Sequence, residues 1–225
     1  MLLKSSILLL CLLGTLQAKE IAYFNPPSTW KIIQQSPSSA VKISFVGKAK
    51  KVCQPVINFA TEEVDISLKK YLVIVQKNCE ADPNKNWRDL GKFLTAAGEG
   101  RLTEILDKSG GKALRQLQLI FLKDTTIYVV TASCSQEEFP KLYPEFYTSF
   151  KSFNIAYDLV DAVKEKNAQE KLKTLCAQIL KEREFQKNTW DPFEKTILNN
   201  YADMGNYWKL LLLQDIKDKL THTQD

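Results

Sequence analysis

Hydrophobic and polar residues alternate with period two in several stretches of the chain, a pattern that predicts β-strands. We expect strands over residues 41–46, 56–59, 101–106, 114–122 and 126–133. In the last two of these strands, apolar side chains fall on both faces, whereas a sheet with one wet face would alternate more regularly. The sequence therefore predicts an antiparallel sheet with helices on both faces, an α/β/α sandwich of the α+β class.

Apolar residues at helical spacing predict two helices between the early and the late strands. The first covers residues 65–77, with Asp65 as its N-cap. A strand is the alternative there, because the run 73–75 is β-branched. The second is a short helix over residues 87–97 that ends at Gly98.

After the last predicted strand, the spacing of apolar residues is helical only. We expect a turn over residues 136–142 and then a helix that begins at Pro144, because proline inside a helix removes a hydrogen bond. From residue 156 onward the pattern predicts two to four helices. One of them should start at Asp191, with a proline in its first turn.

The first residues have the layout of a secretory signal peptide: a basic start, an apolar run over 5–13, and small residues up to Ala18. We expect cleavage after Ala18 and export to the periplasm or the cell exterior, with an uncleaved membrane anchor as the alternative. The predicted organisation is a signal peptide over 1–18, a sandwich domain over 19–155, and a helical extension over 156–225.

Charge and cysteine content narrow the class of protein. The formal net charge of +5 is spread along the chain, so we expect no nucleic-acid binding, which needs clustered basic residues. The cysteines outside the leader are Cys53, Cys79, Cys134 and Cys176. Export permits disulfides, and four cysteines allow three complete pairings that the sequence does not rank. Cys176, in an apolar helical stripe, fits a buried free thiol at least as well.

The residues that common catalytic sites require are scarce. The chain has one histidine, His222, so catalytic triads and the common zinc sites lack their base or ligand. No glycine-rich phosphate-binding loop occurs, and we expect no cofactor. Paired carboxylates leave a hydrolase as a further alternative. Two acidic clusters would serve it: Glu62, Glu63 and Asp65, and Glu99, Glu104 and Asp107. Because acidic residues are mostly surface groups, we expect no enzyme.

The order of several core and turn segments resembles a known family. These segments are Pro27 to Trp30, the 41–46 strand, Pro55-Val-Ile-Asn-Phe, Leu68 with Tyr71-Leu72, Leu117-Gln-Leu-Ile-Phe-Leu, Ile127-Tyr-Val-Val-Thr-Ala, Phe139 with Tyr143-Pro-Glu-Phe, and Ser152-Phe153. The family is the PsbP-like fold, shared by the photosystem accessory protein, a Ran-binding nuclear import factor and DcrB-like bacterial envelope proteins. The resemblance covers about residues 25 to 155 and implies a central antiparallel sheet between helices, in proteins that mostly act as accessory or binding subunits.

We therefore expect an exported, non-catalytic accessory protein of the cell envelope that acts through protein–protein contacts. The candidate partner surface consists of Trp87, Trp190, Trp208, Tyr207, Lys48, Lys50 and Lys51. Tryptophan more often packs in a core, and a short lysine run is more often a solvated loop. The lysines could also touch anionic lipid in a peripheral membrane contact. The alternative function is a periplasmic carrier of a small apolar ligand or lipid, held between sheet and helices.

Overall fold

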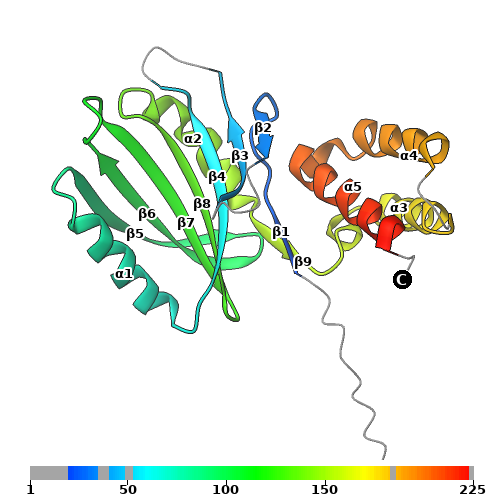
Figure 1. Ribbon diagram of the computed structural model, residues 1–225, viewed down its shortest axis with the longest axis horizontal. Coiled ribbons are helices and arrows are strands. Elements are labelled where there is room, and N and C mark those ends of the chain that lie inside the picture. Colours follow the sequence, from blue (N-terminus) through cyan, green and yellow to red (C-terminus); the bar gives the residue numbers. More distant parts are fainter. Residues whose placement is uncertain (1–19, 35–40, 49–52, 183–185, 223–225) are drawn as a thin grey trace, which may run out of the picture.

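The computed structural model describes residues 20–34, 41–48, 53–182 and 186–222. Its centre is an antiparallel sheet of seven strands in the order β2-β3-β4-β8-β7-β6-β5 (Figure 1). The strands are β2 (Lys31–Gln34), β3 (Val41–Val46), β4 (Val56–Glu63), β5 (Lys85–Thr95), β6 (Gly98–Asp107), β7 (Leu114–Lys123) and β8 (Thr126–Ser135). The α+β class and the central antiparallel sheet predicted from the sequence are confirmed.

The five strands predicted from the alternation of residues are all present, as β3, β4, β6, β7 and β8. β3 has the predicted bounds, and β4 continues four residues beyond the prediction because it pairs with β8 along its whole length. β7 and β8 form a hairpin whose turn holds Asp124 at a positive φ of 51°. Asparagine and aspartate adopt this left-handed conformation more readily than other non-glycine residues.

The helix predicted over residues 87–97 is wrong, since this segment is the edge strand β5, paired with β6 over its whole length. A bulge between Asp89 and Gly91 shifts the pairing, and Gly91 takes a φ of 102°. The extra residue of a bulge reverses the faces that follow it. Trp87 therefore lies opposite Ile105 on one face, whereas Phe93 lies opposite Gly100 on the other.

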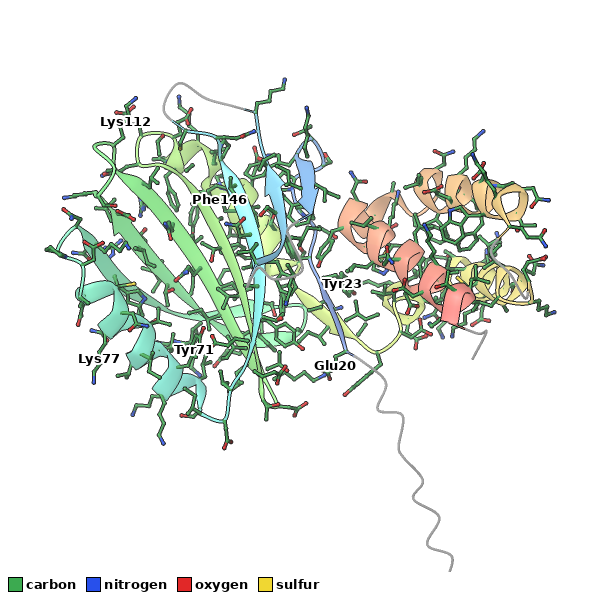
Figure 2. The ribbon with its side chains drawn as sticks, viewed as in Figure 1. Glu20, Tyr23, Tyr71, Lys77, Lys112 and Phe146 are labelled. Carbon is green, nitrogen blue, oxygen red and sulfur yellow. The ribbon has the colours of Figure 1, made fainter. Side chains whose placement is uncertain are left out.

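One face of the sheet is covered by α2 (Phe139–Lys151). Phe146 lies beneath this helix (Figure 2) and is fully buried, as are Phe150 and Phe153. Trp30 packs edge-on against Phe146, with 6.1 Å between ring centroids. Burying each such side chain stabilises the fold by about 1.5–3 kcal/mol. The predicted helix start at Pro144 is wrong, because α2 begins at Phe139 and runs through Pro144. The carbonyl that loses its partner belongs to Pro140, which is exposed, so water can satisfy it.

The opposite face carries α1 (Leu68–Glu80), which packs against β5 (Figure 1). Helices therefore lie on both faces, as predicted, but α1 begins three residues later than expected. Its N-cap is Ser67, whose hydroxyl accepts a hydrogen bond from the Lys70 amide, and not Asp65. The structure thus decides for a helix over the alternative strand.

The C-terminal segment is helical and packs against the sandwich (Figure 1). Its elements are η1 (Val160–Ala162), α3 (Lys166–Ile179), α4 (Lys187–Asn199), η2 (Ala202–Met204) and α5 (Gly205–His222). A two-stranded sheet of β1 (Ile21–Tyr23) and β9 (Asn154–Ala156) lies where the segment leaves the sandwich. α4 begins four residues before the predicted Asp191, and Pro192 lies inside it. None of the described helices is long and apolar enough to cross a bilayer.

Tyr207 of α5 joins the C-terminal helices to the sandwich core. Its ring lies 5.5 Å from that of Phe24, 5.2 Å from that of Phe45 and 6.4 Å from that of Phe59, measured between centroids. The indole nitrogen of Trp208 donates a hydrogen bond to the Leu159 carbonyl at 3.0 Å. The helices and the sheet therefore share one continuous hydrophobic core.

Candidate functional site

Helix α1 buries few of its side chains against the sheet. Of its 13 residues, Cys79 is the only buried one. Val73 and Ile74 are 44% and 47% exposed, and Leu68 and Leu72 on the inner side are only partly buried. A surface helix normally derives most of its stability from an apolar face packed against the core. The inner face of α1 therefore leaves apolar surface available for a further contact.

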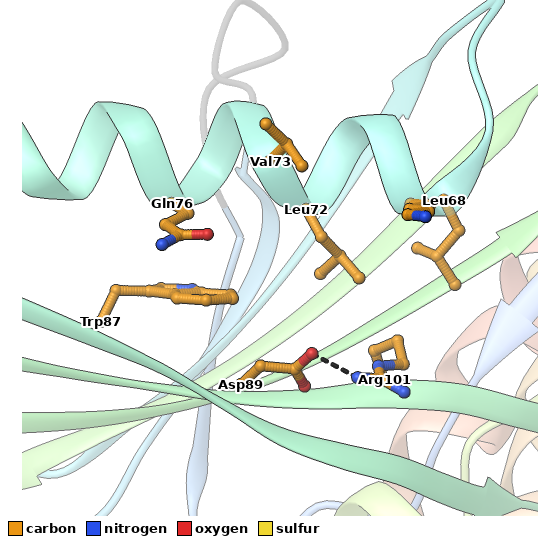
Figure 3. A pocket seen from close by; sticks show the side chains of 8 residues that line it. Leu68, Leu72, Val73, Gln76, Trp87, Asp89 and Arg101 are labelled. Carbon is orange, nitrogen blue, oxygen red and sulfur yellow. Dashed lines mark hydrogen bonds and ion pairs between the residues drawn. The ribbon is translucent and has the colours of Figure 1, made fainter.

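A cleft of about 540 Å³ lies between α1 and the strands β5 and β6 (Figure 3). Leu68, Leu72 and Val73 of α1 form its apolar side. Trp87 of β5 forms the opposite wall, below the amide of Gln76. The remaining lining residues are Lys69, Asp89 and Arg101. Volumes of 300–1,000 Å³ with mainly apolar walls and a few polar groups are typical of small-molecule sites.

The polar groups of this cleft include two unpaired donors. The Arg101 guanidinium bonds to the Asp89 carboxylate through Nη2, as the dashed line in Figure 3 marks. The Nε of Arg101 and the Nε1 of Trp87 are buried and have no hydrogen-bond partner among the described residues. A buried donor without a partner costs about 1–3 kcal/mol. The two donors are separate from each other, since Trp87 lies opposite Ile105, four residues along β6 from Arg101.

Tyr71 holds the first half of α1 to the sheet. Its hydroxyl donates a hydrogen bond of 2.9 Å to the Glu62 carboxylate at the end of β4. Burial of the phenol, together with the negative charge of Glu62, raises the pKa of Tyr71 to about 12. The phenol therefore stays protonated and keeps donating throughout the physiological pH range.

A row of polar side chains crosses the sheet on the same face as the cleft. Ser44 donates to Asn58 at 2.6 Å, and Gln118 bridges Thr131 and Thr103 at 3.3 Å each. These residues are register neighbours on β3, β4, β8, β7 and β6. The face of the β7–β8 hairpin beneath α2 is apolar, as expected. The opposite face is apolar at Ile120, Leu122, Ile127 and Val129, as expected, and polar from Gln118 and Thr131 toward the other end of the hairpin.

The acidic residues proposed for a hydrolase do not form a pair. Glu99 and Glu104 are five positions apart on β6, so their side chains point to opposite faces. Glu99 is exposed and pairs with Lys92 at 2.9 Å. Glu104 is buried and binds the guanidinium groups of Arg88 and Arg115, each at 2.5 Å. The third residue of this cluster, Asp107, accepts hydrogen bonds from Ser109.

The residues of the other acidic cluster, Glu62, Glu63 and Asp65, do not form a carboxylate pair either. Glu62 binds Tyr71, and Glu63 accepts hydrogen bonds from the hydroxyls of Thr125 and Thr126. Asp65 is exposed in the loop before α1. Within the described ranges, no three His, Cys, Asp or Glu side chains gather as a metal site requires.

The structure separates the residues predicted to form a partner surface. Trp208, Tyr207 and Trp190 are 0%, 4% and 7% exposed, so they belong to the core and cannot contact a partner in this conformation. The physical reason is that α4 and α5 pack their aromatic residues inward, against the aliphatic face of α3 and against the sandwich. Lys48 is exposed, and Lys50 and Lys51 lie outside the described residues. Trp87 alone lines the cleft.

The four described cysteines are free thiols. Cys79, Cys134 and Cys176 are buried and Cys53 is partly buried. Burial raises the pKa of Cys134 to about 12 and that of Cys176 to about 11. The buried free thiol expected for Cys176 is observed, and the described cysteines form none of the three pairings that the sequence allowed.

Two residues of the cleft, Asp89 and Arg101, were not singled out from the sequence. The segment 87–97 was predicted to be helical, and a helix would have placed Asp89 on a solvated surface. The available signal was the spacing of two positions between Trp87 and Asp89, which puts both on one face of a strand. The bulge at Gly91 hid that signal by interrupting the alternation.

Comparisons with known proteins give likenesses at low identity. No protein-family model matches the chain, and no curated protein matches it either. Among solved structures, the chain is similar to LpqN, involved in cell envelope biogenesis of Mycobacterium tuberculosis, with a TM-score of 0.48 and 14% identity over 64% of this chain and 87% of that chain. It is also similar to cyanobacterial PsbP from Synechocystis, with a TM-score of 0.41 and 12% identity over 64% and 96%.

A third solved structure similar to the chain is a Pseudomonas aeruginosa protein of unknown function, with a TM-score of 0.37 and 12% identity over 56% of this chain and 81% of that chain. PsbP, whose family the sequence resembles, is thus among the similar solved structures. Likenesses at this level carry no assignment of function.

Proposed function

We propose that the protein is an exported, non-catalytic binding protein of the cell envelope whose ligand site is the cleft beneath α1. The ligand is a small molecule with an apolar body. Export rests on the signal-peptide pattern of the first 18 residues. The absence of a catalytic role is supported by the dispersal of the acidic side chains into separate structural contacts.

One observation carries this proposal: a 13-residue helix that buries a single side chain stands over an apolar cleft. A ligand in the cleft would remove Leu68, Leu72 and the Trp87 ring from water. Each square ångström of apolar surface removed from water contributes about 25 cal/mol. Binding would thus supply the contact that α1 does not make with the sheet.

Binding of the neutral apolar dye N-phenyl-1-naphthylamine, measured by its fluorescence, tests this function. Leu72→Trp fills the cleft and should weaken dye binding by about tenfold or more, because the space for an apolar ring is lost. The matched control is Leu175→Trp, which puts the same side chain into a second groove of about 400 Å³ between α3 and α4. Absence of dye binding, or equal effects of the two substitutions, would contradict the proposal.

A second candidate function is the protein–protein contact expected from the sequence, and one observation favours it. Tyr143 and Tyr147 of α2 are 37% and 40% exposed, with ring centroids 6.0 Å apart, and Tyr147 packs on Phe93. Exposed, paired tyrosines are typical of binding surfaces for proteins. Crosslinking in intact cells, compared between the native chain and a Tyr143→Ser, Tyr147→Ser variant, tests it. A partner captured equally by both chains would count against this surface.

A further inference from the structure

We propose that a second site, on the face of the sheet that α2 covers, binds a singly charged oxyanion, either a carboxylate or a phosphodiester group. The site is a polar hollow of about 320 Å³ lined by Asn86, Arg88, Glu104, Leu106, Arg115 and Gln136. Arg88 contacts the anion, while Arg115 and Glu104 set the charge around it. This site is independent of the α1 cleft, which lies on the opposite face of the sheet.

Strand pairing brings the charged residues of this hollow together. Arg88 of β5 lies directly opposite Glu104 of β6. Arg115 of β7 lies opposite Leu106, two positions further along β6 and on the same face. Arg88 binds one oxygen of Glu104 through Nε at 3.1 Å and Nη2 at 2.5 Å. Arg115 binds the other oxygen through Nε and Nη2, each at 2.5 Å, so the two guanidinium groups are neighbours on one carboxylate.

The charges of the hollow do not cancel. Two guanidinium groups meet one carboxylate, and the other described residues of the lining are uncharged, so the formal charge is positive by one. The exposed side-chain amides of Asn86 and Gln136 add further N–H donors. Arginine binds carboxylate and phosphate groups in preference to other acceptors. A singly charged oxyanion neutralises the hollow, whereas a dianion would leave excess negative charge beside Glu104.

Arg88 is both held in place and open to solvent. Its side chain is 60% exposed, whereas the side chain of Glu104, which holds it, is 7% exposed. The contacts with Glu104 use Nε and Nη2 of Arg88, so the two N–H groups of Nη1 remain for a ligand. Arg115 is fixed on a second side, because its guanidinium carbon lies 4.2 Å above the ring centroid of Phe139. An anion can therefore enter without movement of a helix, and the ordering of both arginines lowers the entropy cost of binding.

Nuclear magnetic resonance of the purified, isotope-labelled chain tests the site through the Nε–H signals of its arginines. Two anions, propionate and dimethyl phosphate, are each titrated beside an uncharged analogue, propionamide and trimethyl phosphate. We expect at least one anion to shift the Arg88 signal in a saturable way, with a dissociation constant at least about tenfold lower than that of its analogue. The tighter anion identifies a carboxylate or a phosphodiester as the ligand group. Saturable shifts with neither anion, or equal affinity for the uncharged analogues, would overturn the inference.

Three variants, read from the Arg115 signal that all of them keep, assign the roles. Arg88→Gln removes the contacting guanidinium and should weaken the tighter anion by about fivefold or more. Glu104→Gln removes the opposing negative charge at equal side-chain length and should strengthen the same anion by about threefold or more. The matched control, Lys92→Gln, removes one positive charge from the opposite face of β5 and should change the affinity by less than about twofold. Equal effects of Arg88→Gln and Lys92→Gln, or weaker binding in a folded Glu104→Gln variant, would overturn the inference.

Discussion

Replacing Tyr207 by alanine tests whether the C-terminal helices and the sandwich fold as one unit. Tyr207 is 4% exposed, and its ring contacts Phe24, Phe45 and Phe59, all of which belong to the sandwich core. The two nearer contacts have centroid distances of 5.5 Å and 5.2 Å and are edge-on, the arrangement that aromatic rings prefer. Tyr207→Ala removes all three contacts and leaves a cavity at the junction.

The expected loss of stability follows from the size of the buried ring. Truncation of a buried aromatic side chain to alanine typically costs about 3–5 kcal/mol, and each aromatic pair contributes about 0.5–1.5 kcal/mol of such totals. We expect a decrease in the free energy of unfolding of about 3–4 kcal/mol. For a chain of this size, about 2–4 °C of melting temperature is lost per kcal/mol, so the transition should move down by roughly 6–16 °C.

Urea denaturation followed by circular dichroism and by tryptophan fluorescence measures this loss. The control is Tyr207→Phe, which keeps the ring and its three contacts and should change the free energy of unfolding by less than about 1 kcal/mol. Two results would refute the reasoning. One is a loss below about 1 kcal/mol in the alanine variant. The other is a native chain in which helices and sheet unfold in separate transitions.

Three further predictions concern thiols, a buried carboxylate and acid stability. Because burial raises the pKa of Cys134 to about 12 and that of Cys176 to about 11, both thiols should resist iodoacetamide at pH 8 until the chain unfolds, as mass spectrometry of labelled peptides would show. Glu104→Ala leaves Arg88 and Arg115 without their shared carboxylate and should lower the free energy of unfolding, measured by urea denaturation, by about 2 kcal/mol. The control Glu99→Ala removes an exposed carboxylate and should lower it by about 0.5 kcal/mol or less. Equal losses in the two variants would contradict the assigned contacts. Hydrogen bonds from Ser109 hold the pKa of Asp107 below its ordinary value of 3.8 in the folded chain. The ionised carboxylate therefore stabilises the fold at pH values above 3.8, and this contribution is lost as the pH falls through the folded-state pKa. Asp107→Asn should therefore flatten the decrease of stability between about pH 4 and pH 2, and an unchanged slope would contradict this.

The sheet could be predicted from the sequence where the alternation of residues was uninterrupted. β3 follows period two along its length, whereas β7 and β8 alternate only in part and are recognised by their runs of strand-forming apolar residues on either side of a polar turn. β5 was missed because the bulge at Asp89 and Gly91 reverses the faces, so that Trp87 and Phe93 point to opposite sides although both are odd positions. Local propensity gives no warning of such a bulge, which depends on pairing with β6.

The helices show a similar division between local and tertiary causes. Pro144 was expected to start a helix, but burial of Phe139 and Phe146 on one side and solvation of the freed carbonyl on the other allow α2 to continue through it. The cleft could not be predicted at all. It needs α1 and β5 side by side, and its unpaired donors are visible only when the contacts of Trp87 and Arg101 are known.

Photocrosslinking with an N-methyl amide of a diazirine-bearing decanoic acid tests the central claim most directly. The purified full-length chain is irradiated with the probe, and the labelled peptides are identified by mass spectrometry. The account predicts labels on residues 68–76 of α1 and on Trp87 to Asp89 of β5, which Leu72→Trp abolishes and Leu175→Trp does not. Labels on the groove between α3 and α4, or labels that survive Leu72→Trp, would contradict it.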